Sequence, residues 1–198
     1  VVLSGINQFS TPVITDNPET NWSLYGSFEK KIYYFRAGIN TSLNWFSYTQ
    51  TLNDITTQND RSSQNVGVTL RTAKKDWPSL EVGYKKGFSQ FNGLTQSNYK
   101  TDAFNTEGSI EFLKNFVYKF SYENLKNTDD NNQTNFYEIA NTSLRYQEKN
   151  NPFGFELSVN NVFDNQRKNS FSFSDFSIVN NFRYVMPRVI LFSVSYKL

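Results

Sequence analysis

Carboxylates are the candidates for acid–base chemistry in this chain, because it has no histidine and no cysteine. The usual general base and the thiolate and imidazole ligands of metals are therefore absent. Glu107 and Glu111 stand on one face of a predicted strand, where they are about 13 Å apart. The paired carboxylates of glycosidases are closer together. We expect no enzyme activity and no cofactor from these residues.

A polar run, Asp129-Asp130-Asn131-Asn132, contains the ligand types that calcium prefers. It lacks the ligand spacing and the glycine of a recognised calcium loop. We interpret it as a solvated surface loop, and the sequence predicts no metal site.

Other charged side chains occupy strand-like positions, mostly opposite apolar residues. They are Arg36, Arg71, Glu81, Lys85, Glu107, Glu111, Lys119, Glu123, Arg145, Glu156 and Lys197. If the strands enclose a lumen, these residues line it with charges of both signs. Hydrated charges that pair across strands are the simpler interpretation, and a substrate path through some of them is the alternative.

Exposed aromatic side chains could stack on a ligand such as a sugar or a chelate ring. For Trp77 a place at a membrane interface is the better interpretation, and Tyr48 is left open. Phe171, Phe173 and Phe176 lie in a predicted outer loop and are the candidate ligand contacts.

The elements that position these residues are predicted from residues 33–48, where side chains alternate between two faces. One face is apolar and carries Tyr33, Phe35, Ala37, Ile39, Thr41, Leu43 and Trp45. The other carries Tyr34, Arg36, Gly38, Asn40, Ser42 and Asn44. A tilted strand of roughly 9–11 residues crosses a bilayer, and aromatic girdles mark both interfaces. The pattern predicts a transmembrane β-strand.

Similar alternation recurs along residues 1–198, which we treat as one domain. It predicts an all-β, antiparallel transmembrane barrel segment of about ten strands, beginning with a weak strand at residues 1–10. Tight turns are expected at residues 29–31, 74–78, 114–115 and 148–152, and long loops at residues 49–63, 91–102, 124–135 and 164–187. The tight turns are assigned to the periplasmic rim. A soluble β-sandwich is the alternative.

Composition excludes a helical membrane bundle but not a barrel. Hydrophobic residues are 37% of the chain and the mean hydropathy is −0.60. No apolar run approaches the roughly 18 residues of a membrane helix. The net charge of +2 is unclustered, so no nucleic-acid partner is expected. The chain starts at Val1 without a signal-peptide pattern, and we expect a mature or partial chain.

The C-terminal part contains two short motifs and a terminal strand. Asn161, Val162, Phe163 and Asp164 form N-V-F-D, and Pro187 and Arg188 precede a strand that ends with Tyr196 and Leu198. This order resembles the C-terminal end of TonB-dependent outer-membrane receptors, with Val162 in place of the usual leucine and Leu198 in place of the usual aromatic.

The resemblance implies that the chain is the C-terminal part of a 22-stranded barrel in the bacterial outer membrane, without its plug domain. It implies import of a scarce nutrient such as an iron chelate or a glycan. The implied partners are outer-membrane lipid, the TonB complex through an N-terminal part, the barrel-assembly machinery, and a surface lipoprotein or another envelope subunit.

Two alternatives stay open. One is an autonomous small outer-membrane barrel or a structural subunit of an envelope complex. The other is an outer-membrane hydrolase, which a chain without histidine makes the weaker choice. We also expect that the chain does not close by itself, because its first and last strands would present unpaired edges to lipid.

Overall fold

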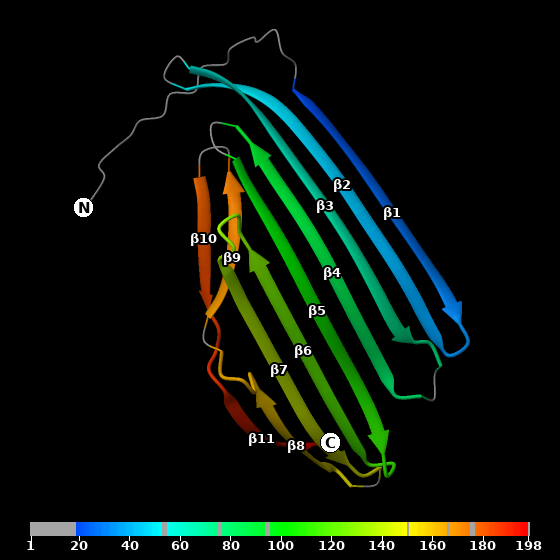
Figure 1. Cartoon of the computed structure of the whole chain (residues 1–198). Helices are drawn as coiled ribbons and strands as arrows, with labels where there is room; N and C mark the ends of the chain where they lie inside the picture. Colours follow the sequence, from blue (N-terminus) through cyan, green and yellow to red (C-terminus); the bar gives the residue numbers. More distant parts are fainter. Residues whose placement is uncertain are drawn as a thin grey trace, which may run out of the picture.

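The computed structural model describes residues 19–52, 55–74, 77–93, 96–149, 151–165, 167–174 and 177–197. Every regular element in these ranges is a β-strand (Figure 1). The strands are β1 (Thr20–Ile32), β2 (Phe35–Leu52), β3 (Ile55–Thr72), β4 (Ser79–Asn92), β5 (Gln96–Phe112), β6 (Phe116–Thr128), β7 (Thr134–Gln147), β8 (Phe153–Asn160), β9 (Arg167–Ser174), β10 (Ser177–Tyr184) and β11 (Val189–Tyr196). In this described part, no helix is long and apolar enough to span a membrane.

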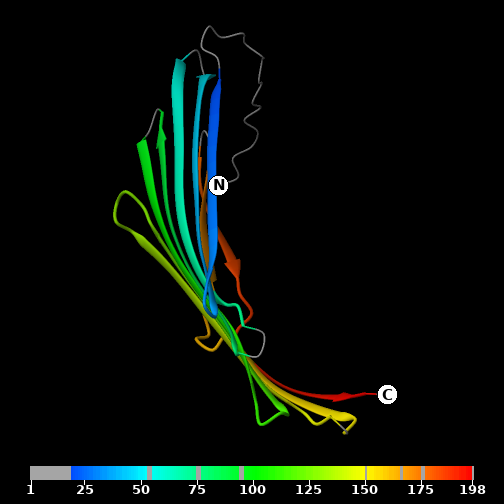
Figure 2. The ribbon, with the colours of Figure 1, turned by 90° about the vertical axis from the view of Figure 1, so that its right-hand side faces the viewer.

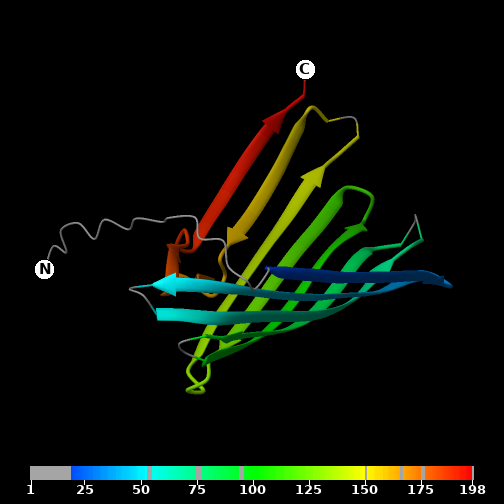
Figure 3. The ribbon, with the colours of Figure 1, turned by 90° about the horizontal axis from the view of Figure 1, so that it is seen from above.

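The strands form two sheets. Nine of them make one sheet in the order β1-β2-β3-β4-β5-β6-β7-β8-β11, and β9 and β10 make a separate two-stranded sheet. All pairings are antiparallel. The large sheet is bent and stays open, with β1 and β11 at opposite edges (Figures 2 and 3). The predicted all-β, antiparallel class is confirmed.

The register explains why these segments pair as they do. Residues directly opposite each other share a face of the sheet, and Leu24 faces Leu43 while Phe28 faces Ile39. A slip of one residue would bring apolar side chains opposite polar ones. The apolar pattern therefore fixes the β1–β2 pairing.

The first turn lies later than the sequence predicts. β1 continues through the expected turn at residues 29–31 to Ile32, and the chain reverses at Tyr33 and Tyr34. Tyr33 has a φ of 52°, a left-handed conformation that is rare for tyrosine. Tyr33 is therefore a turn residue and not the start of the apolar face.

Three of the predicted long loops are largely strand. β2 and β3 have 18 residues each and are joined at residues 53–54, and β5 covers most of residues 91–102. Between β6 and β7 the connection is residues 129–133. The prediction was wrong because these strand ends carry polar residues on both faces and so show no alternation, while their backbone ladder continues unchanged.

The remaining connections agree better with the sequence. The turns after β3, β5 and β7 lie at residues 73–78, 113–115 and 148–152, and Leu113 and Lys114 have φ values of 50° and 61°. Within the predicted loop at residues 164–187, the structure has the β9–β10 hairpin. The predicted strand at residues 1–10 lies outside the described residues.

Candidate functional site

The register divides the nine-stranded sheet into two faces. The face that bears Leu43, which we call the apolar face, carries the following residues among others: Trp22, Leu24, Phe28, Ile39, Trp45, Val66, Val68, Leu70, Val82, Ile110, Phe120, Leu144, Leu157, Val159, Phe192 and Val194. The opposite face, which we call the polar face, carries Ser42, Asn65, Ser121 and Asn141 among its residues.

Among the described residues, no protein layer covers the apolar face. Ile39 is 48% exposed, Val68 46% and Phe192 67%, whereas in the described part of the chain the buried hydrophobic residues are Tyr48 and Tyr137. A soluble sandwich would bury such a face under a second sheet. The sheet therefore needs an apolar surrounding from outside the described chain.

An aromatic row borders the apolar face at the end where the chain turns at residues 113–115 and 148–152, which we call the short-turn end. Ring centroids are 5.5 Å apart for Phe112–Phe116, 4.9 Å for Phe116–Tyr146 and 6.5 Å for Tyr146–Phe155. The row continues from Phe155 to Phe192, whose ring centroids are 6.3 Å apart. The row thus crosses five strands without a break.

A second aromatic row borders the other end of this face. Trp22 and Trp45 lie 6.4 Å apart, and Tyr122 contacts Phe104 at 6.0 Å and Phe163 at 6.1 Å. On β2 the two borders are marked by Phe35 and Trp45, about 33 Å apart along the strand. A tilt near 40–45° reduces this to about 25 Å, the height of the apolar band of an outer-membrane barrel.

Charged side chains of the apolar face lie near this second row. Asp102 faces Lys86 and Lys126 across the ladder, with Lys86 Nζ 3.7 Å from its Oδ1. The Tyr84 hydroxyl donates a hydrogen bond of 2.5 Å to the same carboxylate. These charges mark where the apolar band ends on β4 to β6.

The predicted lumen residues all take the polar face where they lie within strands. Arg36, Arg71, Glu81, Lys85, Glu107, Glu111, Lys119, Glu123, Arg145 and Glu156 are on it by register. Lys197 follows β11, and its backbone N–H donates to the Pro152 carbonyl at 2.8 Å. Glu107 and Glu111 share the face as predicted.

Glu29 joins two of these cations. Its carboxylate lies 3.2 Å from Arg36 and 2.7 Å from Arg71. The three side chains are 42–44% exposed, so water screens the pairs and each adds little stability. The three side chains form a solvent-exposed charge cluster on the polar face of the sheet.

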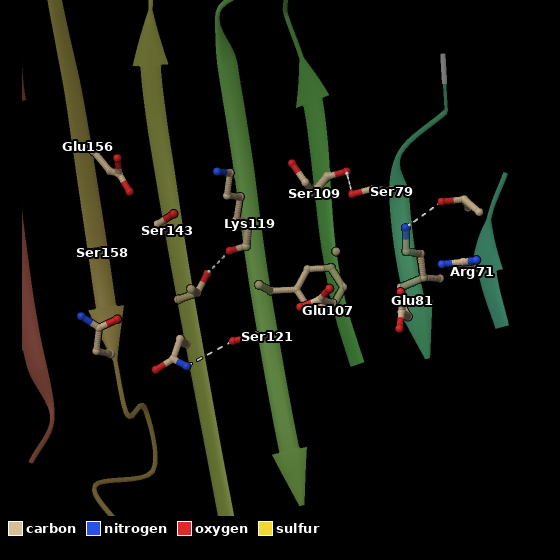
Figure 4. Close-up of a pocket in the computed structure, with 17 residues that line it drawn as sticks. Arg71, Ser79, Glu81, Glu107, Ser109, Lys119, Ser121, Ser143, Glu156 and Ser158 are labelled. Atoms are coloured by element: carbon tan, nitrogen blue, oxygen red, sulfur yellow. Dashed lines mark hydrogen bonds between the residues drawn. The ribbon is translucent and has the colours of Figure 1, made fainter. Parts of the chain in front are cut away.

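A shallow hollow of about 560 Å³ lies on this part of the sheet. Figure 4 shows its charged lining side chains spread over adjacent strands. Hydroxyls stand between the charges, namely Ser79, Ser109, Ser121, Ser143 and Ser158. Asn141 donates to Ser121 Oγ at 3.1 Å. Such a surface can hold water and polar solutes by hydrogen bonds.

The described residues offer no metal centre, since they contain no group of three or more histidine, cysteine, aspartate or glutamate side chains that could hold one. The acidic run 129–132 forms a turn in which Asp129 Oδ1 accepts the N–H groups of Asn131 and Gln133 at 3.0 and 2.8 Å. Asp130 accepts the Asn98 N–H at 2.6 Å. These bonds fit the predicted surface loop.

The surroundings of this turn change the pKa of the nearby Tyr99 hydroxyl. Partial burial first, and then the negative charges of Asp129 and Asp130, raise the pKa of Tyr99. Tyr99 lies in the part of β5 beyond the apolar band, and its phenol is therefore held in the protonated form over a wider pH range.

Glycines on the polar face are packing positions that the sequence analysis missed. Amide and hydroxyl side chains of neighbouring strands lie across them, so that a Cβ atom on Gly67 would stand 2.6 Å from Asn40 Oδ1. A Cβ atom on Gly38 would stand 2.6 Å from Thr69 Oγ1. The missing Cβ atoms leave room for these amide and hydroxyl side chains to lie close to the sheet. Only the strand register shows which side chain lies over which glycine.

The structure places the aromatic residues that were considered as ligand contacts in different surroundings. Trp77 lies at the short-turn end, 4.6 Å from Tyr34 and 6.3 Å from Phe35, and Lys74 Nζ is 4.9 Å from its ring. Tyr48 is buried and stacks on Phe46 at 5.0 Å, so it is no exposed ligand contact. Of the phenylalanine candidates, Phe171 and Phe173 belong to β9, whose backbone alone is described. Phe176 lies outside the described residues.

The N-V-F-D motif forms a turn that directly follows β8 and contacts the segment leading into β11. Asn161 is 2% exposed and has a φ of 54°. Its side-chain amide donates to the carbonyls of Asn165 at 2.8 Å and Met186 at 2.9 Å. Asp164 Oδ1 accepts the Arg188 N–H at 2.8 Å. The motif and the Pro187-Arg188 step therefore contact each other directly.

Comparison with known proteins gives little sequence similarity. No family model and no curated protein matches the chain. A solved structure that matches is "OmpT (in-vitro folded), an outer membrane protein of Vibrio cholerae", with 10% identity and a TM-score of 0.48 over 90% of this chain and 55% of that chain. The chain thus spans about half the length of that structure. The matched protein is an outer-membrane protein, the location predicted here.

These comparisons correct the expected family. The match to OmpT contradicts the prediction of a TonB-dependent receptor and, with it, the predicted nutrient import. The predicted TonB partner stays a prediction. The residues behind the resemblance, Asn161, Asp164 and Arg188, serve a local turn. Asparagine tolerates a positive φ, and an aspartate carboxylate readily accepts a backbone N–H. These residue types therefore suit a turn of this kind in any protein. Leu198 lies outside the described residues.

Proposed function

We propose that this chain forms part of the wall of a bacterial outer-membrane β-barrel, with the apolar face against lipid and the polar face lining a water-filled lumen. The observation that carries the proposal is the separation of the two faces across nine strands, with an aromatic row at each end of the apolar one. The function is then to hold a hydrated lumen across the membrane, as an autonomous small barrel or as a structural subunit.

The exposed apolar side chains supply the energetic argument. Removing one large aliphatic or aromatic side chain from water is worth about 1.5–3 kcal/mol. Leu24, Leu157 and Ile190 are 57%, 48% and 65% exposed, and many others of this face are similar. Lipid covers all of them at once, which explains a stable sheet with hardly any core of its own.

The polar face supports a passive, hydrated lumen. Its carboxylates are exposed or half-buried and stand among serines and lysines, without histidine anywhere in the chain. Water and hydrated solutes suit such a wall. Lipid and the barrel-assembly machinery are the partners that this proposal needs.

Orientation follows from the ends of the sheet. Outer-membrane barrels have short turns in the periplasm and longer extracellular segments. We therefore assign the turns at residues 113–115 and 148–152 to the periplasm, and the projecting ends of β2 to β5 and the β9–β10 hairpin to the outside.

Cysteine scanning tests the proposal, because the chain has no cysteine of its own. Single cysteines replace Val68 and Val159 on the apolar face, with Thr69 and Ser158 as adjacent controls on the polar face. In reconstituted vesicles we expect a water-soluble maleimide to label the controls alone. A fluorophore placed at the first two positions should be quenched by brominated lipid. Equal labelling of both sets contradicts the proposal.

A further inference from the structure

The two edge strands of the large sheet run in the same direction. Each of its nine strands is antiparallel to the next, from β1 to β8 and then to β11. Eight antiparallel steps return the chain to its starting direction, so β1 and β11 both run toward the short-turn end. Along the described strands neither outer edge has a pairing partner (Figure 1).

Both edges lie at membrane depth. β1 carries Trp22 of one aromatic row and reaches Ile32 at the short-turn end, and β11 carries Phe192 of the other row. Their described residues are exposed almost throughout. In hydrocarbon an unpaired backbone N–H or C=O group is very unfavourable, so each edge requires a strand beside it.

Direct closure of β1 on β11 would need a parallel pair. Parallel pairs are slightly less stable per residue, and bacterial outer-membrane barrels made from one chain have an even number of antiparallel strands. A second copy does not help, because two copies with one orientation in the membrane again bring β1 against a β11 of the same direction. Figure 1 shows β1 and β11 at opposite edges of the sheet.

We infer that an odd number of further membrane-spanning strands of the same protein molecule lies between β11 and β1. The strand next to each edge runs away from the short-turn end, antiparallel to its neighbour. This inference rests on the proposed function, since lipid is what forces both edges to be paired.

The edges also define the side chains of these neighbours. A strand beside β1 must present apolar residues on the face of Leu24 and Phe28 and polar residues on the face of Ser27. Beside β11 the same rule applies to Val194 and Ser193. These requirements describe amphipathic strands, and a helix or an irregular segment cannot satisfy them.

Paired cysteines in the full protein, in its native membrane, test the inference. Ser27→Cys or Ser23→Cys on β1 is combined with Ser193→Cys or Ser195→Cys on β11, giving four pairs on the polar face. The control pair is Ser27→Cys with Asn40→Cys, which are directly opposite on β1 and β2. A short bismaleimide should link the control pair and none of the four others.

Spin labels on the same pairs give the expected distance. The β1–β11 separation should be at least two strand spacings, about 10 Å. A β1–β11 cross-link within one molecule would overturn the inference in favour of a nine-stranded parallel closure. A cross-link between two molecules would overturn it in favour of closure by copies.

Failure of the proposed function would look different. A water-soluble maleimide would then react with Val68→Cys in the same membranes, whatever the β1–β11 result. Protection of Val68→Cys together with a β1–β11 cross-link leaves the membrane wall standing and removes only the odd number of strands.

Discussion

The part of the sheet between the aromatic rows and the part of β2 to β5 that projects beyond them follow different rules. Between the rows, Leu43 and Val68 alternate with polar neighbours. Beyond them, Gln50 faces Thr57 in an unbroken ladder with no alternation. Backbone pairing is the same in both regions, and under the proposed function only the surrounding solvent differs. The comparison teaches that strand length follows backbone pairing, whereas alternation marks the part of the sheet that we propose to contact lipid.

The sharpest test of this difference is a charge in each region. Val159→Arg should destabilise the folded protein by about 2–4 kcal/mol, because the guanidinium enters the middle of the apolar band. Asn92→Arg, on the projecting end of β4, should cost under about 0.5 kcal/mol. Urea unfolding in lipid vesicles measures both, and Ser158→Arg serves as the polar-face control. Similar costs at residues 92 and 159 would remove the distinction between the regions.

The turn after β8, which contacts the segment leading into β11, gives the next largest effect. Asn161→Ala removes the hydrogen bonds to Asn165 and Met186 from a buried site, which should cost about 1–3 kcal/mol. Asn160→Ala, one residue earlier and exposed, should cost much less. The unfolding midpoints of the two variants should differ clearly. If they coincide, the turn does not hold β11 in place.

Glycine packing on the polar face can be tested with a pair of substitutions. Gly67→Ala places a methyl group against Asn40 and should cost about 1–2 kcal/mol, in the range of overpacked sites. Adding Asn40→Ala removes the obstructing amide and should restore most of the stability. Absence of this rescue in a double-mutant cycle would show that the close contact is not the cause.

The smallest effect is expected at the Glu29 cluster. Glu29→Gln should cost about 0.2–1 kcal/mol at low salt, because exposed ion pairs contribute little. The difference from the natural protein should shrink further as salt screens the charges. Unfolding at two ionic strengths measures this, and a cost that is independent of salt would point to hydrogen bonding instead.

Sequence alone identified the faces, because residues such as Phe35 and Trp45 alternate with polar residues along one strand. It misplaced the first turn, since nothing about Tyr33 signals a positive φ. It interpreted residues 49–63 as loop, because polar residues on both faces of these strand ends leave no alternation. It also took the Asn161–Asp164 motif as a sign of family, although the hydrogen bonds of a buried turn explain those residue types. The glycine contacts depend on pairing between distant segments, which no local pattern contains.

The separation of the two aromatic rows sets the bilayer thickness that the protein fits best. Their separation, about 25 Å across the membrane, matches one bilayer thickness and fits others only with strain. In a thicker membrane the lipid chains would have to shorten locally or the strands would tilt less, each at a modest cost per ångström. The bacterial outer membrane is thinner than average. The spacing between Phe35 and Trp45, eleven residues of a single strand, would thus favour one membrane thickness over another.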